Sequence, residues 1–477
     1  QYCLGRPSRV SVTRDNSQAS PVTRTTRHIW SADTCSKEAE VSGEPAPLAQ
    51  RLLTMQVWNE RGQLAEVTRT SADFSLPERK TLYTYDAWGN RPVTETAVIS
   101  GQASPVIRRA WRYGLDLQLS ETSPRGLVTG WAWDDFGRMK QETRADGPGT
   151  TVQYLSCSGN CFAARGVYQV RSSRSDGFWS TTINDAWGRA VGSEFPLTGG
   201  QSSRQLTEYD AVGRVHRQTV PYVSGESQYW VEYRHDLAGR RKSEDRPVDE
   251  SGSAVASTRW TASLLTKTVR DAENRIITQS YDAEDKLIAV SSPTGGTTSY
   301  AYTPFGEIST LGDANGNVTM LHYDERGLQT SVESADTGRR SSVWNAFGEL
   351  VSQTDALSPA NTINFSYDQL GRLIQRSDSG QSPTIWTFHT ASGPLLGLPQ
   401  RVTAPLGSAA AGFVEQYGYD ALGRRTSVST TIDGTTWLTS YGWDSLGRVA
   451  TMIYPQTVDG AQVSLAYHYD STGNLDV

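Results

Sequence analysis

A six-residue phrase recurs along most of the length of this chain. Two copies read Tyr-Asp-Ala-x-Gly-Arg, at residues 209–214 and 419–424. Other copies keep the Asp and the Gly but exchange Tyr for Trp or Arg for Asn, as at 85–90, 133–138 and 443–448. A chain made from one repeated phrase is made from one structural unit, so the repeat constrains the architecture before any single residue is considered.

The spacing between copies predicts β-hairpins. Asp185 and Asp210 stand 25 residues apart, and Asp420 and Asp444 stand 24 apart. Farther along the chain the phrase tightens, and Asp313 precedes the next copy by only 11 residues. A step of about 10 residues is one strand plus one turn. The longer period is therefore a hairpin with its connection, and the spacing favours an all-β architecture.

The residues around each phrase indicate where the strands lie. Val463, Leu465, Tyr467 and Tyr469 alternate with smaller or polar residues, which predicts a strand with one apolar face. The phrase itself is the turn, because Asp accepts hydrogen bonds from nearby backbone N–H groups and Gly tolerates the positive φ of a type I turn that closes into a bulge. A lone hairpin is only marginally stable, so the repeats must pack edge to edge into one large curved sheet.

We therefore assign the repeated residues a structural role in turns and no catalytic role. The residues assigned to the turn motif are Tyr85, Asp86, Gly89, Asp134, Gly137, Tyr209, Asp210, Gly213, Arg214, Asp324, Gly327, Tyr367, Asp368, Gly371, Arg372, Tyr419, Asp420, Gly423, Arg424, Asp444, Gly447, Asp470 and Gly473.

The domain organisation follows from the continuity of the repeat. A length of 477 residues suggests about three domains, but the repeat runs without a break in composition. We predict one domain over residues 55–477, with residues 1–54 as irregular or degenerate repeats continuous with it. Hydrophobic residues make up only 36% of the chain, yet it has 14 Trp and 21 Tyr. Sheets that bury aromatic rings on one face and expose the other face to solvent produce this balance.

Charge and hydropathy exclude several partners. The net charge is −6, with both signs mixed along the chain, so no basic stripe suits a nucleic acid. No apolar run approaches the roughly 18 residues of a membrane span. The sequence starts within irregular sequence and stops just after a turn phrase, so we expect a piece of a longer polypeptide.

Few residues are candidates for chemistry. Residues 313–317 resemble the start of a calcium loop, but the twelfth position holds Asp324 of the next phrase where a calcium loop needs Glu, so a turn is favoured and no metal or cofactor is expected. We expect a disulfide between Cys157 and Cys161 if the protein is exported, with two free buried thiols as the alternative. A zinc site made of all four cysteines, Cys157 and Cys161 with Cys3 and Cys35, is disfavoured because their spacing is not that of a zinc finger. No nucleophile, metalloprotease or phosphate-loop motif is present, so no enzyme is predicted.

The phrase Tyr-Asp-x-x-Gly-Arg with these spacings resembles the YD-repeat, or Rhs, family over residues 55–477. That family includes bacterial Rhs polymorphic toxins, the cocoon-forming B and C subunits of Tc toxin complexes, and animal teneurins. The resemblance implies a spiralling β-sheet that forms part or all of a hollow shell. In the bacterial members the shell encloses a C-terminal toxin, released by self-cleavage at an Asp-Pro-x-Gly segment. The nearest match here, residues 123–126, has Ser in place of Asp and lies within the repeats.

The resemblance implies a non-catalytic scaffold of a secreted or cell-surface bacterial toxin, which encapsulates and protects a C-terminal toxin polypeptide before delivery. Its implied partners are that cargo, outside this chain, the remaining parts of the same polypeptide or shell, and a delivery apparatus. The alternative is a cell-surface adhesion module that binds carbohydrate or protein. Trp179, Trp230 and Trp437 lie outside the phrase and are the candidates for such binding.

Overall fold

The computed structural model describes residues 6–16, 19–159, 161–249, 254–406, 409–457 and 459–476. Within these ranges the chain forms 41 β-strands and two short 3-10 turns, η1 (Leu48–Gln50) and η2 (Thr198–Gly200), and no α-helix. The all-β prediction is confirmed. No helix in the described ranges is long and apolar enough to cross a membrane.

The strands follow one another at short intervals along the whole chain. The first twenty are β1 (Arg9–Asn16), β2 (Ala19–Trp30), β3 (Lys37–Glu44), β4 (Leu52–Trp58), β5 (Leu64–Ser71), β6 (Arg79–Tyr85), β7 (Pro92–Val98), β8 (Val106–Arg112), β9 (Leu117–Thr122), β10 (Val128–Trp133), β11 (Met139–Arg144), β12 (Thr150–Ser156), β13 (Tyr168–Arg174), β14 (Trp179–Asn184), β15 (Ala190–Pro196), β16 (Ser202–Tyr209), β17 (Val215–Thr219), β18 (Tyr222–Val223), β19 (Trp230–His235) and β20 (Arg241–Pro247). The others are β21 (Val255–Ala262), β22 (Thr266–Arg270), β23 (Ile276–Tyr281), β24 (Leu287–Ser291), β25 (Thr297–Tyr302), β26 (Ile308–Gly312), β27 (Val318–Tyr323), β28 (Gln329–Ser334), β29 (Gly338–Trp344), β30 (Leu350–Thr354), β31 (Thr362–Tyr367), β32 (Leu373–Asp378), β33 (Thr384–Phe388), β34 (Pro399–Leu406), β35 (Ala409–Tyr419), β36 (Arg425–Ile432), β37 (Thr435–Trp443), β38 (Val449–Ile453), β39 (Ser464–Ala466), β40 (His468–Tyr469) and β41 (Leu475–Asp476).

Thirty-nine of these strands form one sheet, and β40 pairs with β41 in a separate hairpin. Neighbours in the sheet are antiparallel and mostly consecutive, except that β16 pairs with both β17 and β18, while β17 pairs with β19. The register shifts where the phrase begins: Ser366 lies opposite Gln375, but Tyr367 lies opposite Leu373. The extra residue on the return strand is the β-bulge that closes the turn.

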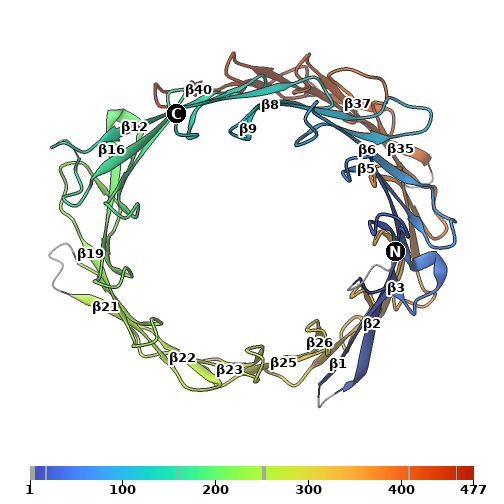
Figure 1. The fold of residues 1–477 in the computed structure, drawn as a ribbon, viewed down its shortest axis with the longest axis horizontal. Helices are drawn as coiled ribbons and strands as arrows, with labels where there is room; N and C mark the ends of the chain where they lie inside the picture. Colours follow the sequence, from blue (N-terminus) through green and yellow to red (C-terminus); the bar gives the residue numbers. More distant parts are fainter. Residues whose placement is uncertain are drawn as a thin grey trace.

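The sheet winds into a ring around a central space that no described segment crosses (Figure 1). The ring closes by overlap, because Arg79 bonds to Glu349, 270 residues later, and Arg125 bonds to Leu422, 297 residues later. We call residues 6–300 the first winding and residues 301–476 the second winding. In Figure 1 the orange and red strands β35 and β37 are seen over the same arc of the ring as the blue and teal strands β6 and β8.

The two edges of the ribbon differ. The motif edge holds the connections β2–β3, β4–β5, β6–β7, β8–β9, β10–β11, β12–β13, β14–β15, β16–β17, β19–β20 and then every odd-to-even connection from β21–β22 to β37–β38. The connections between these hairpins make up the opposite edge. Where the phrase has its half period, copies alternate between edges, so Asp313 lies at the opposite edge and Asp324 at the motif edge. Because a single strand separates such copies and each strand runs from one edge of the ribbon to the other, consecutive copies lie at opposite edges.

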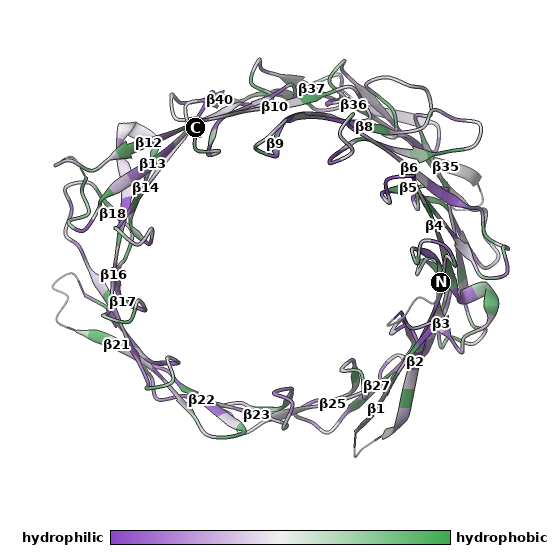
Figure 2. Cartoon of the chain, in the orientation of Figure 1, coloured by the Kyte–Doolittle hydropathy of each residue, from purple (hydrophilic) through white to green (hydrophobic). Residues whose placement is uncertain are grey.

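The wall is one sheet thick, so few side chains are fully buried. Ala163, Ile183 and Val191 form a small buried cluster, against which Phe162 and Leu206 pack. Hydrophilic and hydrophobic residues are interspersed all around the ring (Figure 2). Stability must therefore come largely from contacts between neighbouring hairpins, as in other repeat proteins.

Candidate functional site: the repeated turn and the seam between windings

Each repeated turn is closed by one aspartate. In the copy at residues 209–214, Asp210 Oδ1 accepts hydrogen bonds from the backbone N–H groups of Val212 (3.0 Å) and Arg214 (2.9 Å). Asp210 Oδ2 accepts a bond from Arg214 Nε at 2.7 Å. Gly213 has φ +90°, a conformation that costs a residue with a side chain about 1–2 kcal/mol. The phrase thus satisfies its own polar groups and forms a self-contained turn.

The same arrangement recurs through the chain. Copies in which the Asp side chain bonds both the backbone and the guanidinium of the Arg four residues later are those of Asp134, Asp185, Asp210, Asp236, Asp271, Asp368, Asp420 and Asp444. Asp86, Asp324 and Asp470 close turns that carry Asn90, Leu328 and Asn474 at that position. Glycines 89, 137, 213, 327, 371, 423, 447 and 473 all have positive φ.

The motif arginine also reaches the next repeat. Arg424 Nη1 donates to the carbonyl of Asp444 at 3.4 Å, and Arg372 Nη1 donates to Gly397 O at 3.1 Å. The Arg448 guanidinium lies 4.1 Å from the centre of the Tyr469 ring. A guanidinium over an aromatic face contributes about 0.5–1 kcal/mol at exposed sites. Each turn therefore helps to hold its successor.

In most copies where Tyr or Trp precedes the Asp or its substitute, the ring reaches back to the preceding repeat, a role that the sequence did not indicate. Tyr367 Oη donates to Leu350 O at 2.9 Å, and Trp344 Nε1 donates to Gln329 O at 2.8 Å. Leu350 and Gln329 are the first residues of the preceding return strands. Tyr and Trp both carry a donor at the tip of the ring, and Phe does not. The preference for Tyr and Trp over Phe at this position is the sequence signal that could have indicated this hydrogen bond.

We expect Tyr367→Phe to destabilise β30–β32 by about 1–2 kcal/mol, because the Leu350 carbonyl loses its partner while the ring is kept. Hydrogen exchange of residues 350–373 would measure the effect. Tyr113→Phe is the matched control, since Tyr113 is 62% exposed, and it should leave exchange unchanged. Equal protection in both variants would contradict a clamping role for the ring hydroxyl.

The turn network also sets the charge state of the aspartates. The backbone N–H of Arg214 lowers the pKa of Asp210 below its ordinary value of 3.8, and the Arg214 guanidinium adds to this against the opposing effect of burial. At Asp236 the Arg240 guanidinium has the largest effect and again lowers the pKa. Repeated lowered pKa values make the folded state prefer the carboxylate form.

We therefore expect stability that is fully present above pH 3.8 and is lost as pH falls through the lower folded pKa values, because over that range the unfolded chain binds protons that the folded chain does not. Circular dichroism between pH 7 and pH 2 would follow the loss. Asp210→Asn supplies the local control, because exchange of residues 209–215 should then depend less on pH across the same window. A variant with the wild-type pH profile would be inconsistent with this origin.

The seam joins the motif edge of the second winding to the opposite edge of the first. Arg79, at the start of β6, pairs with Glu349 at 2.6 Å and lies 3.8 Å from the centre of the Phe347 ring. The two charged side chains are only 24% and 13% exposed. Arg24 of β2 likewise pairs with Glu307 and lies 4.0 Å from the Phe305 ring. Arginine from one winding thus meets an aromatic ring and a carboxylate from the other.

The seam continues in both directions along the ribbon. Arg326 Nη1 donates to Gln50 O at 2.8 Å, and the backbone N–H of Ser100 donates to Gln369 Oε1 at 3.0 Å. Near the end of the chain the windings touch backbone to backbone. A Cβ at Gly447 would lie 2.7 Å from Asp146 O. The seam therefore depends on close approach as well as on ion pairs.

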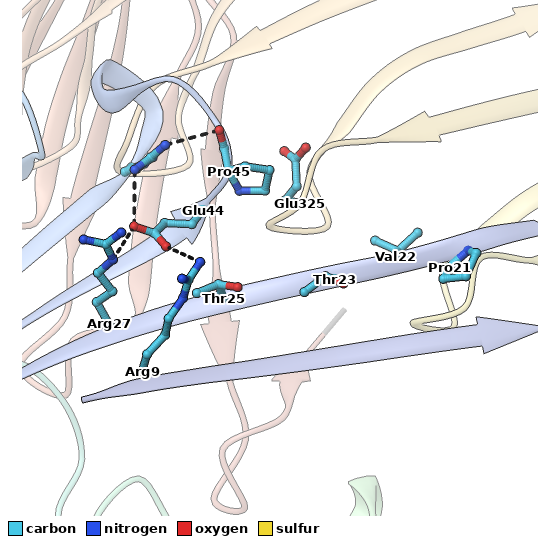
Figure 3. Close-up of a pocket in the computed structure, with 10 residues that line it drawn as sticks. Arg9, Pro21, Val22, Thr23, Thr25, Arg27, Glu44, Pro45 and Glu325 are labelled. Carbon is cyan, nitrogen blue, oxygen red and sulfur yellow. Dashed lines mark hydrogen bonds and ion pairs between the residues drawn. The ribbon is translucent and has the colours of Figure 1, made fainter. Parts of the chain in front are cut away.

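A cluster of three arginines around one carboxylate lies beside the seam (Figure 3). The Glu44 side chain is 6% exposed and pairs with Arg27 at 2.7 Å, and with Arg9 and Arg51 at 3.3 Å. Glu325 of the second winding also lines this pocket. A buried carboxylate needs such partners because its desolvation is costly. The cluster neutralises Glu44, and Arg51 also donates to the carbonyls of Ala46 and Pro45 within the β3–β4 connection.

The cysteines lie near the small core. Cys157 and Cys161 are joined by a disulfide and pack against the cluster of Ala163, Ile183 and Val191. Cys35 is also disulfide-bonded, whereas Cys3 lies outside the described residues. Among the described residues, no group of three or more His, Cys, Asp or Glu is placed to hold a metal ion.

The three tryptophans outside the phrase occupy separate positions. Trp179 begins β14 beneath the Arg171 guanidinium, 4.5 Å from the ring centre, and Trp230 begins β19 with Arg217 at 4.3 Å. Trp437 lies in β37 and is 38% exposed. The structure places them in three different hairpins and does not gather them into one surface.

Comparisons with known proteins agree with this geometry. Residues 173–388 match the family described as Teneurin YD-shell, and residues 419–459 match RHS Repeat. No curated protein matches the sequence. The crystal structure of TcdB2-TccC3-Cdc42 is similar with a TM-score of 0.55 and 10% identity over 95% of this chain and 38% of that one. The crystal structure of TcdB2-TccC3 is similar with a TM-score of 0.55 and 11% identity over 95% of this chain and 36% of that one.

At such low sequence identity, these similarities are evidence of a shared fold alone. This chain spans little more than a third of the length of the proteins compared. The family matches fall on the stretches where the phrase is most regular, and they confirm the resemblance that its spacing indicated. Models of the YD-repeat, or Rhs, family therefore match residues 173–388 and 419–459, and the described chain has a fold similar to that of TcdB2-TccC3.

Proposed function

We propose that this chain forms part of the wall of a shell that encloses and protects a C-terminal toxin polypeptide of a bacterial YD-repeat toxin before delivery. The observation that carries the proposal is the continuous sheet wound around a central space, with its second winding docked on the first (Figure 1). The names of the two similar assemblies, TcdB2-TccC3 and TcdB2-TccC3-Cdc42, support a toxin-complex context.

The wall is suited to enclosing an unfolded chain without pairing with it. An exposed strand edge is a template for aggregation, and a sheet has two such edges whatever its number of strands. Here 39 strands share one sheet, so the interior strands of the described wall have their backbone groups paired. Along β31 the half-buried Phe365 and Tyr367 alternate with the exposed Asn364 and Ser366, which leaves one face polar.

The proposed role is that of a non-catalytic scaffold. Its partners would be the toxin cargo, outside this chain, the remaining parts of the same polypeptide or shell, and a delivery apparatus. The corresponding location is the cell surface or the medium of a bacterium. The turn aspartates support a structural role because their oxygens are engaged by the backbone and by arginine, as at Asp210.

The test is limited proteolysis of the chain expressed in cis with its C-terminal polypeptide. An enclosed cargo should be cleaved far more slowly than the same polypeptide expressed alone. Arg79→Met, which opens the seam, should speed cleavage of the cargo, whereas Arg138→Met, at the uncovered motif edge, should not. Equally rapid digestion with and without the wall would argue against encapsulation.

The alternative is an adhesion module that binds carbohydrate, and exposed aromatic rings favour it. Trp88 is 71% exposed and Trp187 is 80% exposed, and sugars stack on such rings. A glycan array with the purified chain separates the two functions. A shell should give no specific hits, whereas an adhesin should bind one class of glycan and lose it in Trp187→Ala.

A further inference from the structure

One position of the repeated turn occurs in two different environments. We call the residue two places after the motif Asp, or after its substitute, the tip residue. In the first winding the tip residues of four motif-edge turns are 71–84% exposed: Trp88, Phe136, Trp187 and Val212. A large apolar side chain is more stable when it is buried than when it is exposed to water, so a row of exposed tips favours a partner that covers it.

In the second winding the same position is covered by the first winding. The Phe347 ring lies under Arg79, and the Phe305 ring lies under Arg24, at 3.8 and 4.0 Å. Arg326, also a tip residue, donates to Gln50 O at 2.8 Å. These are contacts of the tip with arginines and carbonyls at or near the opposite edge of the neighbouring winding.

The two environments differ in one respect. All these tips lie on the motif edge of one continuous ribbon, and where another winding lies against that edge the tips are covered. The motif arginine does not cover them, since Arg138 and Arg189 lie 5.1 and 4.7 Å from the Phe136 and Trp187 rings, which are still 84% and 80% exposed. The exposed row is therefore the direct continuation of an interface already present in the molecule.

We propose that the tip row Trp88, Phe136, Trp187 and Val212 is a docking surface for another winding of YD-repeat sheet, which presents arginine side chains and turn carbonyls from its opposite edge. This rests on the proposed function, because a taller wall is built by adding windings. A guanidinium suits the row, since it stacks on aromatic faces and is more weakly hydrated than an ammonium. Apolar rings and arginine are also the groups enriched at the centres of protein interfaces.

A second copy of this chain is the probe, because it carries the matching edge. The opposite edge of its second winding is uncovered at the β30–β31 connection, where Leu357 is 68% exposed. Sedimentation velocity over a range of concentrations should show head-to-tail association. Hydroxyl-radical footprinting of the same samples should show protection of Trp88, Phe136 and Trp187 as the associated fraction rises.

The combined variant Trp88→Asp, Phe136→Asp and Trp187→Asp should weaken association at least about tenfold, since removing interface anchors costs more than 1.4 kcal/mol in total. Phe74→Asp is the matched control. Phe74 is 61% exposed with φ +59°, a conformation that Asp accepts, and it lies on the opposite edge of the first winding, so association should be retained.

A chain that stays monomeric at every concentration, or associates equally well as the combined variant, would overturn the docking surface. So would specific glycan binding that the combined variant abolishes. Since the readout needs no cargo, it separates the two proposals: a wall that protects its cargo without docking a second copy would refute this inference and leave encapsulation standing, and the reverse result would refute encapsulation alone.

Discussion

The Gly447→Ala variant should lose about 3 kcal/mol or more of local stability and release the end of the second winding from the first. Gly447 has φ +80°, which costs an alanine about 1–2 kcal/mol in any setting. The added methyl would also stand 2.7 Å from Asp146 O and 3.3 Å from the Gly147 Cα. Backbone cannot move aside as a flexible side chain does, so the seam must open there.

Gly137→Ala is the control that isolates the seam. Gly137 occupies the same place in the phrase with φ +76°, but the nearest atoms to a Cβ are two methyl carbons of Leu117 at 3.9 and 4.0 Å. It should cost only the roughly 1–2 kcal/mol of the left-handed conformation. Hydrogen exchange of residues 145–149 and 443–449 measures both. Similar losses in the two variants would mean that the approach to Asp146 does not matter.

Arg79→Met should destabilise the seam by about 3–5 kcal/mol, the usual cost of removing one partner of a buried ion pair. Glu349 is 13% exposed and would be left without its guanidinium, while Asn345 Nδ2 would remain its other side-chain donor. Methionine keeps an apolar stem against Phe347, so the loss reports on charge more than on packing. Thermal unfolding and the proteolysis of residues 72–78 would follow it.

Two further variants define the origin of that loss. Glu349→Gln combined with Arg79→Met should recover much of the stability, because no charge is then left buried. Arg138→Met removes an Asp134 partner at the uncovered motif edge, where the Arg138 side chain is 46% exposed, and should cost about 1 kcal/mol or less. A double variant as unstable as Arg79→Met would show that the arginine acts through packing.

The hairpin and the order of the hairpins follow from the sequence alone. Asp210, Gly213 and Arg214 form a turn whose hydrogen bonds join residues at most four apart, so every copy of the phrase encodes its own geometry. The half-period around residues 271–324 likewise encodes the alternation of edges, because one strand separates consecutive copies. The preference for Tyr or Trp before the Asp also lies in the sequence, although its purpose appears only when Tyr367 is seen to bond the preceding hairpin.

Which copies of the phrase become part of an interface depends on how the whole sheet folds. Trp187 and Phe347 hold the same place in the phrase, yet Trp187 is 80% exposed and Phe347 lies beneath Arg79. The hydrogen-bonded partners across the seam stand 269–297 residues apart, a separation set by the small twist and bend that accumulate over many strands. No short sequence pattern encodes the accumulated twist and bend of the sheet. The curvature of the whole sheet therefore determines where the seam forms. The phrase supplies side chains that can either lie exposed to solvent or pack against the other winding.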